Sequence, residues 1–167
     1  MKRAGFTMIE LIFVIVILGI LAAVAIPKLA ATRDDAKVSG LIGNTRTAIG
    51  DFKSFYTSQG ETPYLAANIE DVTDVPLTIG GCNVPATGTA IADGTQFDLC
   101  DGAASTDSAC VSIIINSPAA GENNITVVDN AVATSVCTQV SADPAIKGMA
   151  LPTPGKEHVL GGKAVVR

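Results

Sequence analysis

A single carboxylate, Glu10, interrupts an otherwise apolar stretch near the amino terminus. In residues 6–26 the only polar side chains are Thr7 and Glu10. An ionisable group in such a stretch is costly unless it has a cationic partner or lies at the polar edge of a membrane, so it usually marks a functional position. Glu10 is therefore the first candidate for chemistry, as a group that forms an ion pair.

The cysteines are the second group with defined chemistry. All of them lie in the second half of the chain, and none has the C-x-x-C spacing of zinc sites. An even count without metal spacing predicts two disulfides formed in an oxidising compartment. The spacing alone does not choose among the possible connectivities. We prefer Cys82 with Cys100 and Cys110 with Cys137, because each pair closes a loop of moderate length.

Other residue types that often carry chemistry lack partners in this sequence. His158 is the only histidine and has no serine or cysteine motif beside it, so we expect it to be solvated and not catalytic. Aspartate is a residue type that binds calcium in proteins, and Asp129 and Asp143 are candidates, but no calcium-binding loop of about 12 residues contains them. We therefore predict no metal site, no cofactor and no enzymatic activity.

Asn124 belongs to a short motif for covalent modification. With Ile125 and Thr126 it forms an Asn-x-Thr acceptor for glycosylation, and Glu122 precedes it as in the extended acceptor sequence of some bacterial systems. Such a short motif often occurs by chance. Asn124 is therefore a candidate glycosylation site, and the alternative is a polar turn between two strands.

The apolar run is long enough to cross a membrane. As a helix rising about 1.5 Å per residue, residues 6–26 would span about 30 Å, the thickness of a bilayer core. Their large apolar side chains favour insertion by about 4–8 kcal/mol in sum, whereas one carboxylate costs about 2.5–3.5 kcal/mol or less. We therefore expect insertion. Pro27 removes a backbone hydrogen bond, and with Gly19 it is expected to weaken or bend the helix.

The chain beyond Pro27 predicts an α+β head. Apolar residues from Val38 to Tyr56 recur every three or four positions, which predicts an amphipathic helix that ends near Gly60. After Gly60 the composition turns rich in glycine, proline, threonine and asparagine, and short β-type runs occur at residues 111–115, 125–128, 135–140 and 163–166. The fold class is therefore a long amino-terminal helix packed on a small antiparallel sheet.

Charge and the amino-terminal pattern leave two further readings of the protein. The formal net charge is −5, and lysine and arginine form no cluster after residue 3, so nucleic acid is an unsuitable partner. A secretory signal cleaved near Ala25, or a plain single-pass anchor, would each make the head a monomeric secreted or anchored binding module. The carboxylate at Glu10 and the amphipathic helix that follows argue against the secretory signal, whereas the charges that flank the apolar run do not settle the orientation of a plain anchor.

The residues around Gly5 carry a more specific resemblance. The stretch from Lys2 to Leu11 resembles the amino-terminal signal of type IV prepilins and of the pseudopilins of type II secretion. In that family a basic leader ends in glycine, cleavage precedes a phenylalanine that becomes N-methylated, and a glutamate is fifth in the mature chain. Gly5, Phe6 and Glu10 match these positions, and the likeness extends over about the first 35 residues, including Pro27.

The resemblance implies a filament subunit and its partners. A prepilin peptidase and methyltransferase would cleave after Gly5 and methylate Phe6, and the new amine would pair with Glu10 of a neighbouring subunit. The precursor would span the bacterial inner membrane once with its head in the periplasm, and the filament would be a type IV pilus or a type II secretion pseudopilus. The expected parts are a leader at 1–5, a membrane and filament-core helix at 6–27, its amphipathic continuation at 28–60, and a loop-rich β head with two disulfides at 61–167.

Overall fold

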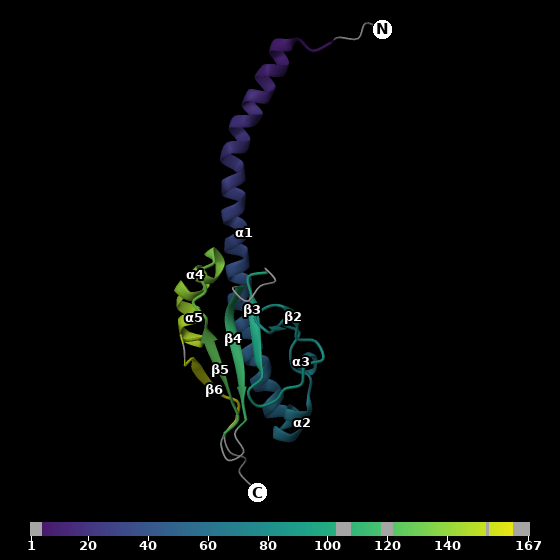
Figure 1. The fold of residues 1–167 in the computed structure, drawn as a ribbon, viewed down its shortest axis with the longest axis vertical. Coiled ribbons are helices and arrows are strands. Elements are labelled where there is room, and N and C mark those ends of the chain that lie inside the picture. The colour runs from purple at the N-terminus through teal and green to yellow at the C-terminus, as the bar shows by residue number, and fades with distance from the viewer. Residues whose placement is uncertain (1–4, 103–107, 118–121, 153, 162–167) are drawn as a thin grey trace. The chain divides into compact units, whose positions relative to one another are not determined.

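The structure, a computed structural model, describes residues 5–102, 108–117, 122–152 and 154–161 (Figure 1). The chain forms two compact units, Met1–Ala36 and Lys37–Arg167. The longest helix, α1 (Met8–Gln59), begins in the first unit and ends in the second.

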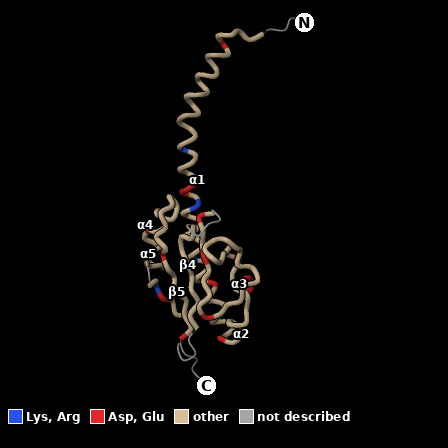
Figure 2. The backbone as a smooth tube through the Cα atoms, in the orientation of Figure 1, with Lys and Arg blue, Asp and Glu red and all other residues tan. Residues whose placement is uncertain are grey.

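The first unit contains the apolar part of α1. The large apolar side chains of this unit are all exposed, with exposed fractions between 42% at Ile17 and 85% at Phe6. Helix α1 continues through both Gly19 and Pro27, and Figure 2 shows its long uncharged stretch. By length and composition, α1 is the one helix among the described residues that is able to cross a membrane. An exposed apolar helix of this length needs either lipid or other protein copies to cover it.

The second unit is built on a six-stranded sheet in the order β2-β1-β3-β4-β5-β6. All five strand pairs are antiparallel. The two longest strands are β4 (Ala109–Asn116) and β5 (Asn124–Asp129), and they contain runs of buried β-branched residues. The other strands are β1 (Thr78–Ile79), β2 (Val84–Pro85), β3 (Gln96–Cys100) and β6 (Lys156–Val159).

The second half of α1 packs on this sheet. Its buried residues, Leu41, Thr45, Ala48, Ile49 and Phe52, recur every three or four positions, which confirms the predicted amphipathic face. The Phe52 ring lies 6.3 Å from the ring of Phe97 on β3, between ring centroids. The predicted α+β fold, a long helix with an antiparallel sheet, is therefore confirmed.

Four short helices complete the described part of the head. They are α2 (Glu61–Ala66), α3 (Ile69–Val72), α4 (Ser135–Ala142) and α5 (Pro144–Met149). Helix α1 ends before Gly60, whose φ of 85° and whose N–H bond to the Tyr56 carbonyl at 2.9 Å terminate it in the left-handed conformation that glycine favours.

One strand prediction is wrong and one cannot be compared. Residues 135–140 were expected to form a strand because they are rich in β-branched side chains, but they begin α4. The Thr134 side chain accepts a hydrogen bond from the Cys137 N–H at 3.2 Å and caps this helix, and Val136, Cys137 and Val140 are buried at helical spacing. The run 163–166 lies outside the described residues.

Candidate functional site

Helix α1 begins with a capping box formed by Thr7 and Glu10. The Glu10 N–H donates to Thr7 Oγ1 at 3.3 Å, and both the Thr7 N–H and its hydroxyl donate to Glu10 Oε2 at 3.4 Å. These reciprocal bonds use amide groups that the first turn of a helix leaves without partners. They are longer than the usual 2.9–3.0 Å, so each is weak.

The capping box leaves part of the Glu10 carboxylate available. Among the described residues, no hydrogen bond reaches its second oxygen, Oε1. Thr7 thus orients the carboxylate through one oxygen while the other is open to a cation. The Thr-x-x-Glu spacing is itself a capping signal in the sequence, although only Glu10 was predicted as a site residue.

The expected processing site lies in backbone outside the helix. Gly5, Phe6 and Thr7 precede α1 and are exposed. A protease needs extended, accessible backbone, because a helix hides its amide groups in internal hydrogen bonds. The Gly5–Phe6 bond is exposed and lies outside the helix, while Gly19 and Pro27, the two positions expected to weaken the helix, lie within α1.

Two disulfides join separate parts of the head. Cys82 is bonded to Cys100 across a Cα–Cα distance of 6.0 Å, and Cys110 to Cys137 across 4.8 Å. These are the two pairs preferred from the sequence. The first attaches the loop between β1 and β2 to β3, and the second attaches α4 to β4.

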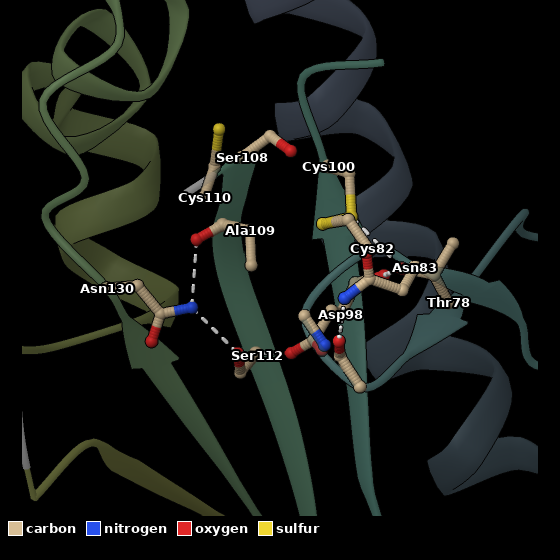
Figure 3. The surroundings of a disulfide bond; sticks show 12 residues. Thr78, Cys82, Asn83, Asp98, Cys100, Ser108, Ala109, Cys110, Ser112 and Asn130 are labelled. Carbon is tan, nitrogen blue, oxygen red and sulfur yellow. Dashed lines mark hydrogen bonds between the residues drawn. A yellow bond between two sulfur atoms is a disulfide. The ribbon is translucent and has the colours of Figure 1, made fainter. Parts of the chain in front are cut away.

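A buried carboxylate organises the neighbourhood of the first disulfide (Figure 3). Asp98 on β3 is 1% exposed. Its Oδ1 accepts hydrogen bonds from Gln96 Nε2 at 2.8 Å and Ser112 Oγ at 2.6 Å, and its Oδ2 accepts one from the Gly81 N–H at 2.9 Å. A buried carboxylate is tolerated only when its lone pairs are satisfied in this way. Asp98 therefore holds the loop that carries Cys82, a role that was not predicted from the sequence.

The end of α1 is attached to the head by a polar chain. Asn123, 3% exposed, donates from Nδ2 to the Tyr56 hydroxyl at 3.1 Å and accepts from Ser117 Oγ at 2.6 Å. The main-chain carbonyl of Asn123 accepts a hydrogen bond from the Leu160 N–H at 3.1 Å. This contact fixes the face of α1 against the loops at one end of the sheet.

The hydroxyl of Tyr64 differs from that of Tyr56. Tyr64 is 0% exposed, and its hydroxyl has no hydrogen-bond partner among the described residues. Its ring forms edge contacts with Phe52 and Tyr56, at centroid distances of 6.5 and 5.4 Å. Burial, and secondarily the neighbouring Tyr56, raise the pKa of the Tyr64 hydroxyl well above its ordinary value.

His158 was expected to be solvated, and the structure shows it only partly exposed. The residue lies on β6, is partly buried, and has its Nε2 2.7 Å from the Met149 carbonyl oxygen. Burial is the main cause that lowers its pKa, the nearby charges of Lys53 and Lys156 act in the same direction, and the hydrogen bond to Met149 opposes them. The ring joins β6 to the end of α5.

The remaining candidates lie at element ends. Asn124 is the first residue of β5, and its Oδ1 accepts from Asn116 Nδ2 at 2.8 Å. Asp143 caps α5 by accepting the Ala145 N–H at 2.7 Å, and Asp129 accepts from Ser141 Oγ at 2.6 Å. Within the described residues, no group of three or more histidine, cysteine, aspartate or glutamate side chains is arranged to hold a metal ion.

Comparison with known proteins identifies the amino-terminal segment. Residues 1–26 match the family model described as the prokaryotic N-terminal methylation motif. Over 45 residues, 27% of this chain, the sequence is 44% identical to the type II secretion system core protein G of Pseudomonas aeruginosa. The match spans 32% of that relative, so it does not extend over the whole of either protein. No solved structure matches the chain.

The matched motif contains the residues on which the resemblance was based. Gly5, Phe6 and Glu10 all lie within it, at the start of α1 where Thr7 and Glu10 form the capping box. The amino-terminal segment of the chain therefore carries the prokaryotic N-terminal methylation motif, and over 45 residues the chain is similar to a type II secretion system core protein G.

Proposed function

We propose that this chain is a structural subunit of a type IV pilus-like filament outside the cytoplasm. A prepilin peptidase cleaves it after Gly5, and Phe6 is then N-methylated. The observation that carries the proposal is the methylation motif over residues 1–26, joined to an apolar helix whose side chains are exposed. Such a helix is suited first to a single membrane crossing and then to the core of a filament.

The start of α1 supports an ion pair between subunits. Cleavage creates an amine on Phe6, and methylation keeps its positive charge. Because this amine would have to leave water in the filament core, it needs an anion close by. Glu10 of a neighbouring subunit supplies that anion, with Oε1 open to the cation while Oε2 is held by Thr7. A subunit in the wrong register would bury both charges unpaired, at a cost of several kcal/mol.

The precursor is placed in the bacterial inner membrane with the head in the periplasm. The two disulfides support this placement, since such bonds persist in oxidising compartments. The partners are the prepilin peptidase and methyltransferase, the membrane, and identical or homologous subunits. The acidic net charge supports solubility of the head outside the cell.

The second candidate is a pseudopilin of a type II secretion system. The relative from Pseudomonas aeruginosa favours it, because its name assigns it to that system. Both candidates share the amino terminus, so the head and the place of assembly must distinguish them.

The first experiment is intact mass measurement and amino-terminal sequencing of the protein from cell envelopes and from sheared surface material. A chain that begins at methylated Phe6 and occurs in the sheared fraction supports the pilus subunit. The same chain confined to the envelope supports the pseudopilin. A start near Ile26, or a retained Met1 without assembly, would show that the filament proposal is wrong.

Replacement of Glu10 tests the ion pair separately. Glu10→Ala should leave membrane insertion intact, because removal of a charge only favours it, and should reduce incorporation into filaments. A matched Thr7→Ala variant keeps the carboxylate but removes the capping box, so it should have the smaller effect. Normal filament yield from Glu10→Ala would exclude the proposed role of Glu10.

A further inference from the structure

The head contains an apolar groove beside α3. It has a volume of about 410 Å³ and lies between α3 and the segments that lead to β1 and follow β2. Ile69, Val75, Pro76 and Leu77 supply apolar walls, and two carboxylates, Glu70 and Asp74, also line it. No basic side chain is among the described residues that line this α3 groove.

An acidic recess adjoins the α3 groove. It has a volume of about 170 Å³ and shares Glu70, Thr73 and Asp74 with the groove. Asp51 of α1 and Asp71 of α3 add two more carboxylates. Again, no lysine, arginine or histidine is found among the described lining residues.

Most of these carboxylates are held by neutral donors. Asp51 accepts from Thr73 Oγ1 at 2.6 Å, Asp71 from the Asn68 N–H at 3.0 Å, and Glu70 from the Gly88 N–H at 2.6 Å. Asp74 is exposed and has no hydrogen-bond partner among the described residues. The negative charge is therefore fixed in place and is not neutralised within the described head.

The groove and recess together select the chemistry of an occupant. An apolar stem would cover the groove, and a cationic group would lie among the four carboxylates. Lysine and arginine side chains combine both features, because their methylene stems pack on apolar surface while the charged end remains at the polar rim. Complementary charge at the rim also steers the approach of a partner and fixes its register.

The first unit exposes a segment of this kind. Residues 26–33 contain two cations, Lys28 and Arg33, and no acidic residue. In the same segment Ile26 is 67% exposed and Leu29 is 73% exposed. Ile26, Leu29 and Arg33 also line a hollow on this exposed surface. The segment, named here the basic segment, is apolar like the α3 groove and carries the positive charge that the groove lacks.

We propose that, in the filament, the α3 groove of one copy of this chain receives the basic segment, residues 26–33, of a second copy. This inference rests on the proposed function, since a filament supplies the second copy at high local concentration. Asp74 is the carboxylate that meets the incoming cation, because it is exposed and is not engaged by another described residue.

Thiol cross-linking in assembled filaments tests the contact. The native cysteines of the chain are all in disulfides, so Thr87→Cys in the groove and Thr32→Cys in the basic segment each add one free thiol. The two variants are co-expressed and their filaments treated with a short bis-maleimide. A covalent dimer on a denaturing gel is expected from the mixed filaments, at a higher yield than from filaments of either variant alone, in which only identical positions can be joined. Gln139→Cys on α4, paired with Thr32→Cys, is the matched control and should give none above background.

Charge reversal provides the second measurement. Asp74→Lys alone should lower filament yield by about tenfold or more, because like charges would face each other across the interface. Combining it with Arg33→Glu should restore most of the yield. Glu157→Lys, an exposed acid on β6, is the control and should have little effect. Recovery in the double variant would also exclude misfolding as the cause of the single variant's defect.

The outcomes separate this inference from the proposed function. Filaments of wild-type yield without the Thr32–Thr87 cross-link, or a double charge reversal without recovery, would overturn the groove contact and leave the filament proposal intact. A dimer of equal yield from filaments of either variant alone would also overturn it, because the cross-link would then join identical positions. If the wild-type chain forms no filament, both proposals fail.

Discussion

Removing the hydroxyl of Tyr64 should stabilise the head, although most substitutions in a protein core destabilise it. The side chain is 0% exposed, and its hydroxyl has no partner among the described residues. A buried polar group without a hydrogen bond costs about 1–3 kcal/mol. Tyr64→Phe retains the ring contacts with Phe52 and Tyr56 and leaves a void of only one atom. We expect a gain of about 1–2 kcal/mol in the free energy of unfolding.

The control for this change is Tyr56→Phe. The Tyr56 hydroxyl accepts a hydrogen bond from Asn123 Nδ2 at 3.1 Å, and Asn123 is 3% exposed. Removing the hydroxyl leaves that buried amide without its acceptor, so the head should lose about 1–2 kcal/mol. The same chemical change at two neighbouring rings therefore has opposite expected signs.

Thermal unfolding of the full chain in mild detergent measures both variants. The chain has no tryptophan, so near-ultraviolet circular dichroism of the tyrosines and phenylalanines reports packing of the head. For a unit of this size, about 1 kcal/mol corresponds to about 4 °C in the midpoint. Tyr64→Phe should raise Tm and Tyr56→Phe should lower it. A lowered Tm for Tyr64→Phe would refute the reasoning, since it would mean that the hydroxyl has a partner such as a buried water.

Alkaline pH gives an independent readout of the same group. Burial raises the folded-state pKa of Tyr64 above its ordinary value near 10. Ionisation of Tyr64 therefore leaves the free energy of unfolding unchanged below pH 10. As the pH rises from 10 toward the folded pKa, the head loses stability, because the unfolded chain ionises first. Tyr64→Phe should lose this part of the alkaline destabilisation. An unchanged alkaline slope would contradict the assignment.

Three further changes follow from the head. Gly155→Ala should destabilise the head by about 2–3 kcal/mol in the same Tm assay, because φ is +93° and a Cβ would lie 2.5 Å from Thr126 Cγ2. Gly148→Ala on α5 is the control. A Cβ there meets nothing within 4 Å, so this variant should be neutral or stabilising. The lowered pKa of His158 predicts stability that is complete above pH 6.5 and lost as the pH falls toward the folded pKa, which an acid titration of wild type against His158→Gln would measure. Under mild dithiol treatment the disulfide between Cys82 and Cys100 should open before the one between Cys110 and Cys137, because Cys100 is partly exposed whereas Cys110 and Cys137 are buried. Peptide mass mapping would detect the order, and the reverse order would contradict this reasoning.

The sequence predicted those parts of the fold in which one face is strongly apolar. The buried face of α1 and the two longest strands, β4 and β5, follow from hydrophobic periodicity and β-branched runs. The helix α4 was misassigned because its valine, threonine and cysteine side chains have little helix preference, while the cap by Thr134 and packing on β4 decide the conformation. The short strands β1, β2 and β6 have no periodic signal, because tertiary pairing alone defines them.

The candidate site was predicted unevenly for similar reasons. Gly5, Phe6 and Glu10 form a local motif, so adjacent sequence identifies them. Thr7 was overlooked although its spacing from Glu10 is that of a capping box. The burial of Asp98 had no sequence signal, since its three donors come from Gly81, Gln96 and Ser112, which meet only after the sheet has formed.

The pairing of the disulfides decides how the head would respond to a protease. One bridge encloses residues 82–100 and the other encloses residues 110–137. A cut inside either loop leaves a single covalent molecule, so a non-reducing gel would still show the full mass. A cut between Cys100 and Cys110 instead yields two fragments that only the β3–β4 ladder and the core hold together. Between Cys82 and Cys137, the short connection between the two loops is thus the one stretch where a single cut divides the chain. After such a cut, the resistance of a filament to dissociation would depend on non-covalent packing alone.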